Sequence, residues 1–194
     1  MFSKCILRKG SKIKTIEKNS LVRVNVVGSS GSGKTTFSKT LASKLNIPRI
    51  EMDEIFWDPD WQQPPDEVFF ERVEKALSSE SWVLDGNYTR TTHIKWKKVT
   101  AVVWLDYSYV RILFQTISRS FTNILTGREI WPNSGNKETL RAFFSKKSIL
   151  LWTITNLGKI KKKYEFFITA PGYKQISFYR FRSPKEAKNF LNDI

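Results

Sequence analysis

Cysteine and histidine are almost absent from this chain, which contains one of each among 194 residues. Cys5 therefore has no partner for an intramolecular disulfide, and Cys5 and His93 alone cannot supply the four ligands of a structural zinc site. We expect neither a disulfide framework nor a zinc cluster. A lone cysteine fits a reducing compartment.

Long apolar runs are also lacking. The longest strictly apolar segments, such as residues 101–105 and 149–152, are far shorter than the about 18 residues that a membrane-spanning helix needs. The first twenty residues lack the continuous apolar stretch of a secretory signal. We therefore expect a soluble, cytoplasmic protein without a membrane span. Organelle targeting by the basic tail stays open as an alternative.

Acidic residues are few beside the basic ones, 18 against 33, and the net charge is +15. The excess is local: residues 1–20 hold six basic residues and one acid, and residues 137–163 hold eight basic residues and one acid. The remainder of the chain is nearly neutral. Such runs are typical of solvated surface, then of sites for phosphate-bearing ligands, and then of surfaces that bind polynucleotides or acidic membranes.

The length suits one domain, and 40% hydrophobic with 14% aromatic residues can fill its core. We expect residues 1–20 to form a flexible extension and residues 21–194 a single domain. Apolar runs predict strands at 21–27, 48–53, 82–86, 101–106, 166–169 and 176–181, and helical periodicity predicts helices at 34–45, 67–77, 109–124, 138–157 and after Ser183. This alternation predicts a three-layer α/β fold with a mainly parallel sheet, and ligands at the carboxyl ends of its strands.

A glycine-rich loop follows the first strand and matches the phosphate-binding pattern G-x-x-x-x-G-K-[ST]. Its glycines allow the backbone N–H groups to point inward, the lysine ammonium reaches the outer phosphates, and the following helix adds its positive end. We expect ATP to bind here with Mg²⁺ on the threonine hydroxyl, through Gly28, Ser29, Ser30, Gly31, Ser32, Gly33, Lys34, Thr35 and Thr36. The Asn-Lys-x-Asp motif of GTPases is absent from the sequence.

Together with this loop, two further elements resemble the adenylate-kinase-related P-loop proteins, and within them the group often labelled DNA topology modulation proteins. They are Asp-x-x-Phe-Trp at residues 53–57 and Asp-Gly-Asn-Tyr at residues 85–88, and the likeness extends from Val26 to about Leu157. The resemblance implies a five-stranded core, an acceptor-binding region after the second strand, and a basic lid at about residues 119–140.

Two strand-end carboxylates are candidates for the metal. Asp85 ends a strand that we expect beside the strand before the phosphate loop, so that it holds Mg²⁺ through water. We expect Asp106 to end a strand farther away and to have a structural role. Phosphoryl transfer depends mainly on such positioned charges, because the protein takes little covalent part in it.

The acceptor is expected after the second strand, where Asp53 is a candidate to accept a hydrogen bond from its hydroxyl. Trp57 is a candidate to stack on an aromatic ring. Gly86 allows the backbone to approach a ligand closely, and Asn87 and Tyr88 are candidates to bond to it.

Arg119 and Arg128 flank a turn-rich segment that is expected to close as a lid, carry charge to the transferring phosphoryl group and exclude water. The leading hypothesis is a kinase that transfers the γ-phosphoryl group of ATP to a nucleoside monophosphate or another small acceptor. The alternative is a nucleotide-dependent nucleic-acid-binding protein with weak ATPase activity. The sequence indicates neither the acceptor nor the oligomeric state.

Overall fold

The computed structural model describes residues 5–6, 20–127, 129, 139, 143 and 148–194. Its centre is a sheet of six parallel strands in the order β1-β6-β5-β2-β4-β3. The strands are β1 (Cys5–Ile6), β2 (Arg23–Gly28), β3 (Arg49–Glu51), β4 (Trp82–Asp85), β5 (Ala101–Leu105) and β6 (Ser177–Phe181). The expected α/β fold is confirmed.

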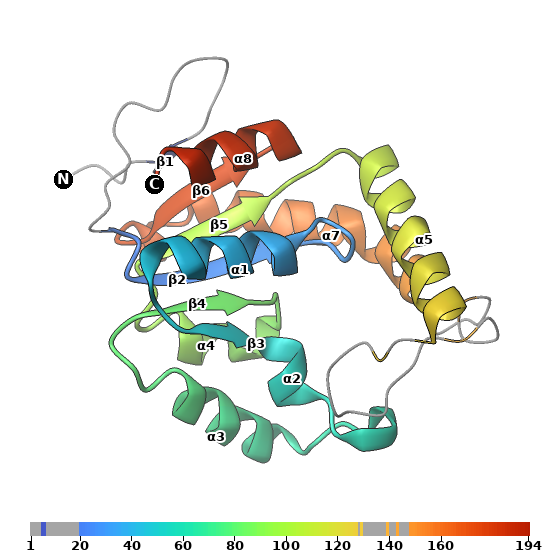
Figure 1. The fold of residues 1–194 in the computed structure, drawn as a ribbon. Helices are drawn as coiled ribbons and strands as arrows, with labels where there is room; N and C mark the ends of the chain where they lie inside the picture. Colours follow the sequence, from blue (N-terminus) through green and yellow to red (C-terminus); the bar gives the residue numbers. More distant parts are fainter. Residues whose placement is uncertain (1–4, 7–19, 128, 130–138, 140–142, 144–147) are drawn as a thin grey trace.

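Helices cover both faces of this sheet (Figure 1). The α-helices are α1 (Lys34–Leu45), α2 (Met52–Phe56), α3 (Asp66–Ala76), α4 (Thr92–Lys95), α5 (Tyr109–Thr126), α7 (Ile149–Thr169) and α8 (Pro184–Asn192). Short 3₁₀ turns occupy Pro59–Trp61, Thr89–Thr91 and Pro171–Tyr173. In the described part of the chain, no helix combines the length and the apolar character that crossing a bilayer requires.

Two apolar clusters, one on each face, hold the layers together. One joins β2, β5 and β6 to α1 and α8, with Leu41 and Phe190 fully buried. The other joins the opposite face to α2, α3 and α7, with Phe69 and Tyr164 in its centre. Because both faces are covered, the central strand β5 is apolar throughout and β4 is apolar up to its last residue, Asp85. Because all the strands are parallel, the turns that follow them lie at the same end of the sheet, the end of the strand carboxyl termini.

The terminal helix begins as its residues predict. Ser183 precedes Pro184, and the Ser183 hydroxyl accepts a hydrogen bond from the Glu186 N–H at 3.3 Å. This hydrogen bond satisfies the Glu186 N–H, which has no acceptor within the first turn of the helix. Pro184 suits the first helical position because it has no backbone N–H to satisfy.

Three boundaries differ from the sequence-based prediction. The second strand ends at Glu51, since Met52 already begins α2. Residues 166–169 are the last turn of α7 and not a strand: Tyr164 and Phe167 pack on Trp96 at helical spacing, and this burial outweighs the β-like run Phe-Phe-Ile-Thr. Helix α7 begins at Ile149, after its N-cap Ser148, and continues to Thr169 beyond the predicted end at residue 157, whereas residues 138, 140–142 and 144–147 of the predicted helix lie outside the described residues.

The extension at residues 1–20 was expected to be flexible, and two of its residues lie in the sheet. Cys5 and Ile6 of β1 pair with Phe178 and Tyr179 of β6, which adds a sixth strand to the five-stranded core that the resemblance implies. Residues 1–4 and 7–19 lie outside the described residues.

Candidate active site

The glycine-rich loop connects β2 to α1 in the conformation that its sequence predicts. Gly31 and Gly33 have φ values of 75° and 81°, a region that favours glycine. A side chain at Gly31 would also collide with Thr116 of α5, so the loop and this helix approach one another closely. The loop therefore sits in a cradle between α1 and α5.

Lys34 begins α1, and its Nζ donates a hydrogen bond to the Ser29 carbonyl oxygen at 2.9 Å. Its ammonium thus lies back over the loop, where the outer phosphates of a nucleotide would bind. Burial lowers the pKa of Lys34, whereas the charges of Asp85 and Asp53 oppose that shift. Both carboxylates are therefore within electrostatic reach of the lysine.

The other side of the loop contacts α5. The Arg119 guanidinium donates to the Ser30 hydroxyl at 3.1 Å, and the Thr116 hydroxyl donates to the Ser30 carbonyl oxygen at 3.4 Å. Arg119 is otherwise exposed. The loop thus has cations on two sides, as a polyphosphate site requires. Arg128 and residues 130–138 and 140 of the expected lid lie outside the described residues.

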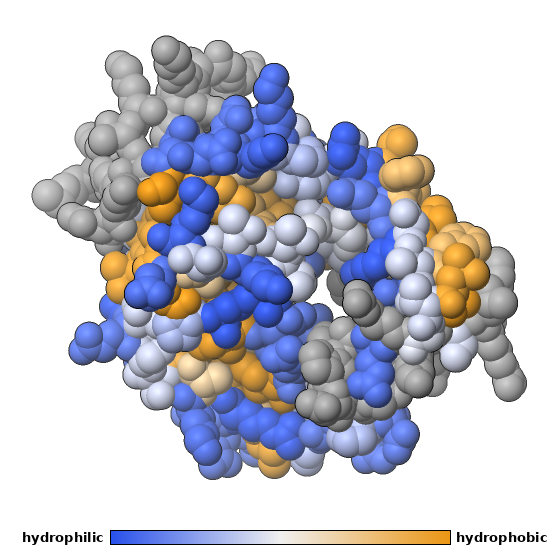
Figure 2. All heavy atoms as spheres, in the orientation of Figure 1, coloured by the Kyte–Doolittle hydropathy of each residue, from blue (hydrophilic) through white to orange (hydrophobic). Residues whose placement is uncertain are grey.

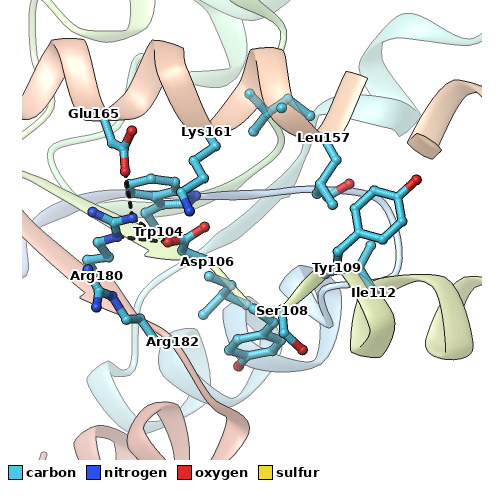
Figure 3. Close-up of a pocket in the computed structure, with 15 residues that line it drawn as sticks. Trp104, Asp106, Ser108, Tyr109, Ile112, Leu157, Lys161, Glu165, Arg180 and Arg182 are labelled. Carbon is cyan, nitrogen blue, oxygen red and sulfur yellow. Dashed lines mark hydrogen bonds and ion pairs between the residues drawn. The ribbon is translucent and has the colours of Figure 1, made fainter. Parts of the chain in front are cut away.

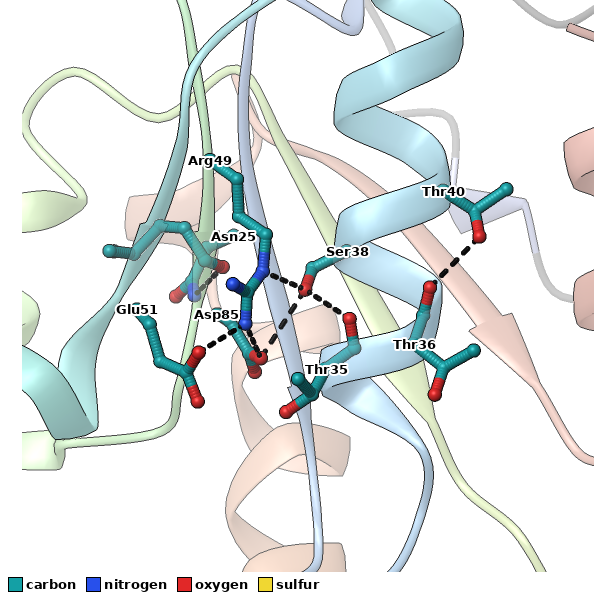
Figure 4. A network of polar contacts seen from close by, with 9 residues as sticks. Asn25, Thr35, Thr36, Ser38, Thr40, Arg49, Glu51 and Asp85 are labelled. Atoms are coloured by element: carbon teal, nitrogen blue, oxygen red, sulfur yellow. Dashed lines mark hydrogen bonds and ion pairs between the residues drawn. The ribbon is translucent and has the colours of Figure 1, made fainter. Parts of the chain in front are cut away.

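Asp85 ends β4 directly beside β2, as predicted, and is 4% exposed. Its Oδ2 accepts hydrogen bonds from the Ser38 hydroxyl and from the Arg49 guanidinium, each at 3.3 Å (Figure 4). Arg49 also pairs with Glu51. Sequence reasoning missed Arg49, whose only signal was a cation on a short predicted strand two residues before Glu51.

Asp106 was expected on a distant strand, and that placement is wrong. β5 lies directly against β2 on the side opposite β4, so Asp106 also follows a strand next to the phosphate loop. The Asp106 carboxylate is paired with Arg180, at 2.8 Å from Nε, and Arg180 also bonds to Glu165 at 2.9 Å. Its expected structural role agrees with these contacts.

A cavity of about 530 Å³ adjoins this ion pair (Figure 3). Its wall includes Ser29 of the phosphate loop, Trp104 of β5, the start of α5 and the α7 residues Leu157 and Lys161. Arg180 lies over the Trp104 ring at 4.2 Å from its centroid. The cavity therefore lies on the β5–β6 side of the loop, away from Asp85.

The predicted acceptor residues gather on the β4–β3 side. Asp53 lies in the first turn of α2, and the Tyr88 hydroxyl donates to its Oδ1 at 2.6 Å. Burial and the neighbouring Asp53 charge raise the pKa of Tyr88, so the hydroxyl keeps the proton that it donates. The ring of Trp57 contacts the ring of Trp61, which is 42% exposed, at 5.5 Å between centroids. The side chains of Asp53, Tyr88, Trp57 and Trp61 thus lie on one side of the loop. We call these four residues the acceptor wall, after their predicted role.

Gly86 and Asn87 connect that wall to the phosphate loop. A side chain at Gly86, where φ is 141°, would collide with Met52 of α2. The Asn87 amide donates to the Gly28 carbonyl oxygen at 2.7 Å and accepts from the Gly28 N–H at 3.0 Å. The expected ligand contact of Asn87 stays a prediction, because in this structure both ends of its amide bond to the loop.

Comparison with solved structures supports the same architecture. The shikimate kinase from Acinetobacter baumannii, solved in complex with shikimate, is similar with a TM-score of 0.51 and 20% sequence identity, over 89% of this chain and 90% of that one. The chain therefore has the P-loop NTPase fold. No protein-family model and no curated protein matches the sequence. The resemblance to DNA topology modulation proteins stays a prediction.

A buried lysine, which sequence reasoning missed, lies beneath the acceptor wall. Lys95 is 1% exposed, and its ammonium donates to the carbonyl oxygens of Asn87 and Tyr88, the latter at 3.4 Å. Tyr88 has φ of 23°, an uncommon value for a residue with a side chain. Lys95 therefore supports a strained turn. Its only sequence signal was one charge between the apolar Ile94 and Trp96.

Two further contacts brace this turn from the sheet and from α7. The buried Asn25 side chain of β2 donates to the carbonyl oxygens of Leu84 and Gly86, at 3.2 and 3.1 Å. Its own oxygen accepts from the Trp96 indole at 3.1 Å. From α7, Lys163 donates to the Thr89 hydroxyl. The geometry of the wall is thus held independently of any ligand.

Lys95 should make the stability of the protein depend on pH in a defined direction. Burial lowers the pKa of Lys95 from 10.5 to about 7, so between these values the unfolded chain binds a proton that the folded chain does not. The contribution of Lys95 to the free energy of unfolding is therefore lowest below pH 7 and increases with pH up to 10.5. We expect urea unfolding of wild type and Lys95→Met, across this interval, to show wild type gaining stability relative to the variant.

The matched control is Lys97→Met, because Lys97 is exposed on the same segment. It should follow wild type at every pH. A stability difference between wild type and Lys95→Met that does not change with pH would contradict the assigned protonation of Lys95.

Proposed function

We propose that the protein is an ATP-dependent phosphotransferase that moves the γ-phosphoryl group of ATP to a small acceptor. One juxtaposition carries this proposal: Lys34 and Arg119 contact the glycine-rich loop, and Asp53 lies within electrostatic reach of Lys34 on the neighbouring wall. Cations beside an acid are what in-line transfer from a phosphate to a hydroxyl needs. The shikimate kinase neighbour supports the fold.

In-line transfer assigns the two substrates to opposite sides of the loop, because the entering and leaving oxygens lie on opposite sides of the phosphorus. The acceptor then lies on the β4–β3 side, against Asp53, Trp57, Gly86 and Tyr88. The nucleoside part of ATP lies toward β5 and β6, the side that also holds the 530 Å³ cavity. Asp53 orients the acceptor hydroxyl by accepting its hydrogen bond.

The donors near the glycine-rich loop fit a magnesium ion. The described residues contain no group of three or more His, Cys, Asp and Glu that would enclose a metal ion. Mg²⁺ bound to a nucleotide does not need one, since phosphate oxygens and water supply most of its ligands. We propose that Thr35 holds it directly and Asp85 through water. Bound there, the ion would neutralise charge on the phosphates, and Arg49 holds the Asp85 carboxylate in place.

The experiment that tests this function is a screen of ADP release with purified protein, ATP and Mg²⁺ against nucleoside monophosphates and small alcohols. We expect one acceptor class to stimulate ADP release well above the rate with water, and a phosphorylated product in equal amount. ADP release that no small acceptor stimulates, together with salt-sensitive binding to duplex DNA, would favour the nucleic-acid-binding alternative.

The Asp53→Asn and Asp85→Asn variants should lose different parts of the activity. Asp53→Asn keeps the size of the side chain and removes the charge on the acceptor wall. It should weaken acceptor use and leave Mg-ATP affinity within about threefold, or roughly 0.7 kcal/mol. Asp85→Asn should weaken the response to Mg²⁺ and slow turnover with every acceptor. Calorimetric titration of Mg-ATP into both variants, beside acceptor kinetics, measures the difference.

The control is Glu54→Gln, since Glu54 neighbours Asp53 on α2 and is exposed. It should behave as wild type in both measurements. A defect in Mg-ATP binding in the Asp53 variant, without one in the Asp85 variant, would reverse the two assignments.

A further inference from the structure

Helix α5 is amphipathic, but its apolar face points to solvent. The side turned inward carries Ile112, Thr116 and Ser120, all buried, of which only Ile112 is apolar. The large apolar residues are exposed: Val110 to 77%, Phe114 to 72% and Leu125 to 84%, and Ile117 and Phe121 to smaller extents. Amphipathic helices of globular proteins normally bury this face, and a large exposed apolar patch marks an interaction site.

The exposed residues form one stripe. Successive residues of a helix are about 100° apart, so spacings of four, three, four and four residues keep positions 110, 114, 117, 121 and 125 on one side. We call these five residues the α5 stripe. Figure 2 shows apolar residues along the outer edge of the molecule where Figure 1 places α5. Leu151 and Ile154 of α7, which packs against α5, are also exposed.

The α5 stripe faces away from the phosphate loop. Thr116 and Arg119 contact that loop from the opposite side of the helix. Phe143 contacts Phe121 at 5.6 Å between ring centroids and leaves Phe121 45% exposed. Among the described residues, the stripe is therefore not a part of the candidate active site.

Charge indicates the kind of partner. Helix α5 contains Arg111 and Arg119 and no acid, and α7 contains four lysines and one acid. Across residues 109–169 the sequence has eleven basic and three acidic residues. An apolar stripe within a cationic segment complements an anionic lipid surface, where apolar insertion and electrostatic attraction act together.

A second copy of the chain fits the stripe less well. Stable protein interfaces use about 20–30 residues from each side. The stripe with Leu151 and Ile154 supplies seven, and a second copy would bring the same positive charge to the contact. We propose that α5 docks this protein on anionic membrane surfaces, with the α5 stripe inserted at the lipid interface and the exposed Arg111, which follows Val110 of the stripe, near the headgroups. This role does not depend on the proposed enzymatic activity.

Vesicle co-sedimentation of the full chain tests this proposal. We expect wild type to sediment with vesicles of equimolar phosphatidylcholine and phosphatidylglycerol, to stay in solution with phosphatidylcholine alone, and to be released by high salt. Phe114→Ser/Leu125→Ser should reduce the bound fraction about tenfold or more, because two large apolar side chains no longer insert. Both residues are exposed, so its thermal unfolding should match wild type.

Val22→Ser/Val68→Ser removes exposed apolar side chains elsewhere and should bind as wild type. If the Phe114/Leu125 variant unfolds early, Val110→Ser/Leu125→Ser provides an independent test of the same stripe. The proposal would be overturned if neither stripe variant bound vesicles more weakly than wild type. It would also be overturned if the wild-type protein did not bind anionic vesicles. A wild-type dimer in sedimentation velocity that becomes monomeric in the stripe variant, without vesicle binding, would assign the stripe to a second copy.

Discussion

Lys34→Ala should abolish most ATP turnover and leave a folded protein. Lys34 is the cation at the outer-phosphate end of the loop, and its ammonium already lies 2.9 Å from the Ser29 carbonyl oxygen. Removing it leaves the developing phosphate charge without its nearest partner. Groups of this kind contribute about 2.7 kcal/mol or more to transition-state stabilisation, so turnover should fall at least about 100-fold.

The fold should survive this change because the loop conformation depends on its glycines and on contacts made by other residues. Gly31 packs against Thr116, and Gly28 is held by the Asn87 amide. Circular dichroism should therefore give a melting temperature close to that of wild type, and ADP release measures turnover. Lys39→Ala, on the exposed side of α1, is the control. ATP turnover in Lys34→Ala equal to that of wild type would contradict the proposed role of the glycine-rich loop in phosphoryl transfer.

Arg119→Ala should lower kcat more than it raises the KM for ATP. The Arg119 guanidinium bonds to Ser30 at 3.1 Å and is otherwise exposed, so it is poised beside the phosphate site without a fixed ion-pair partner among the contacts described above. A cation that meets charge developing in the transition state contributes about 2–4 kcal/mol, which corresponds to roughly 30- to 1000-fold in rate.

Steady-state kinetics at varied ATP separates the two constants. Arg111→Ala serves as the control, because Arg111 lies exposed on the same helix. An Arg119 variant that raises only KM would indicate ground-state binding of ATP. If the Arg119 variant had the kcat and KM of wild type, the cation that stabilises the transferring phosphoryl group would be Arg128 or another residue.

Most elements of the fold could be predicted because local patterns and tertiary packing agree. Strand β2 is mostly apolar and ends at Gly28, β4 ends at Asp85, β5 is apolar throughout, and α1 begins directly at Lys34. The prediction failed at residues 166–169, where a β-like run belongs to α7. Packing of Tyr164 and Phe167 on Trp96 decided that segment, and such contacts between distant parts of the chain are invisible in local sequence.

The candidate site shows the same division. Lys34, Asp85 and Arg119 could be named from motifs and from their positions after strands or along a helix. Arg49 and Lys95 could not, because their roles depend on which carboxylate or carbonyl lies opposite them. The side of the sheet on which Asp106 lies depended on strand order, which the chain sequence does not encode locally.

The sequence by itself determined that this chain has a glycine-rich loop of the pattern G-x-x-x-x-G-K-[ST] between a buried strand and a helix, because turn geometry and hydrophobic periodicity act over a few residues. Only the tertiary structure decided that Asn87 joins this loop to the acceptor wall, that Lys95 supports the strained turn at Tyr88, and that the apolar face of α5 points outward. Each of these depends on residues that are far apart in the chain and become neighbours only when the sheet assembles.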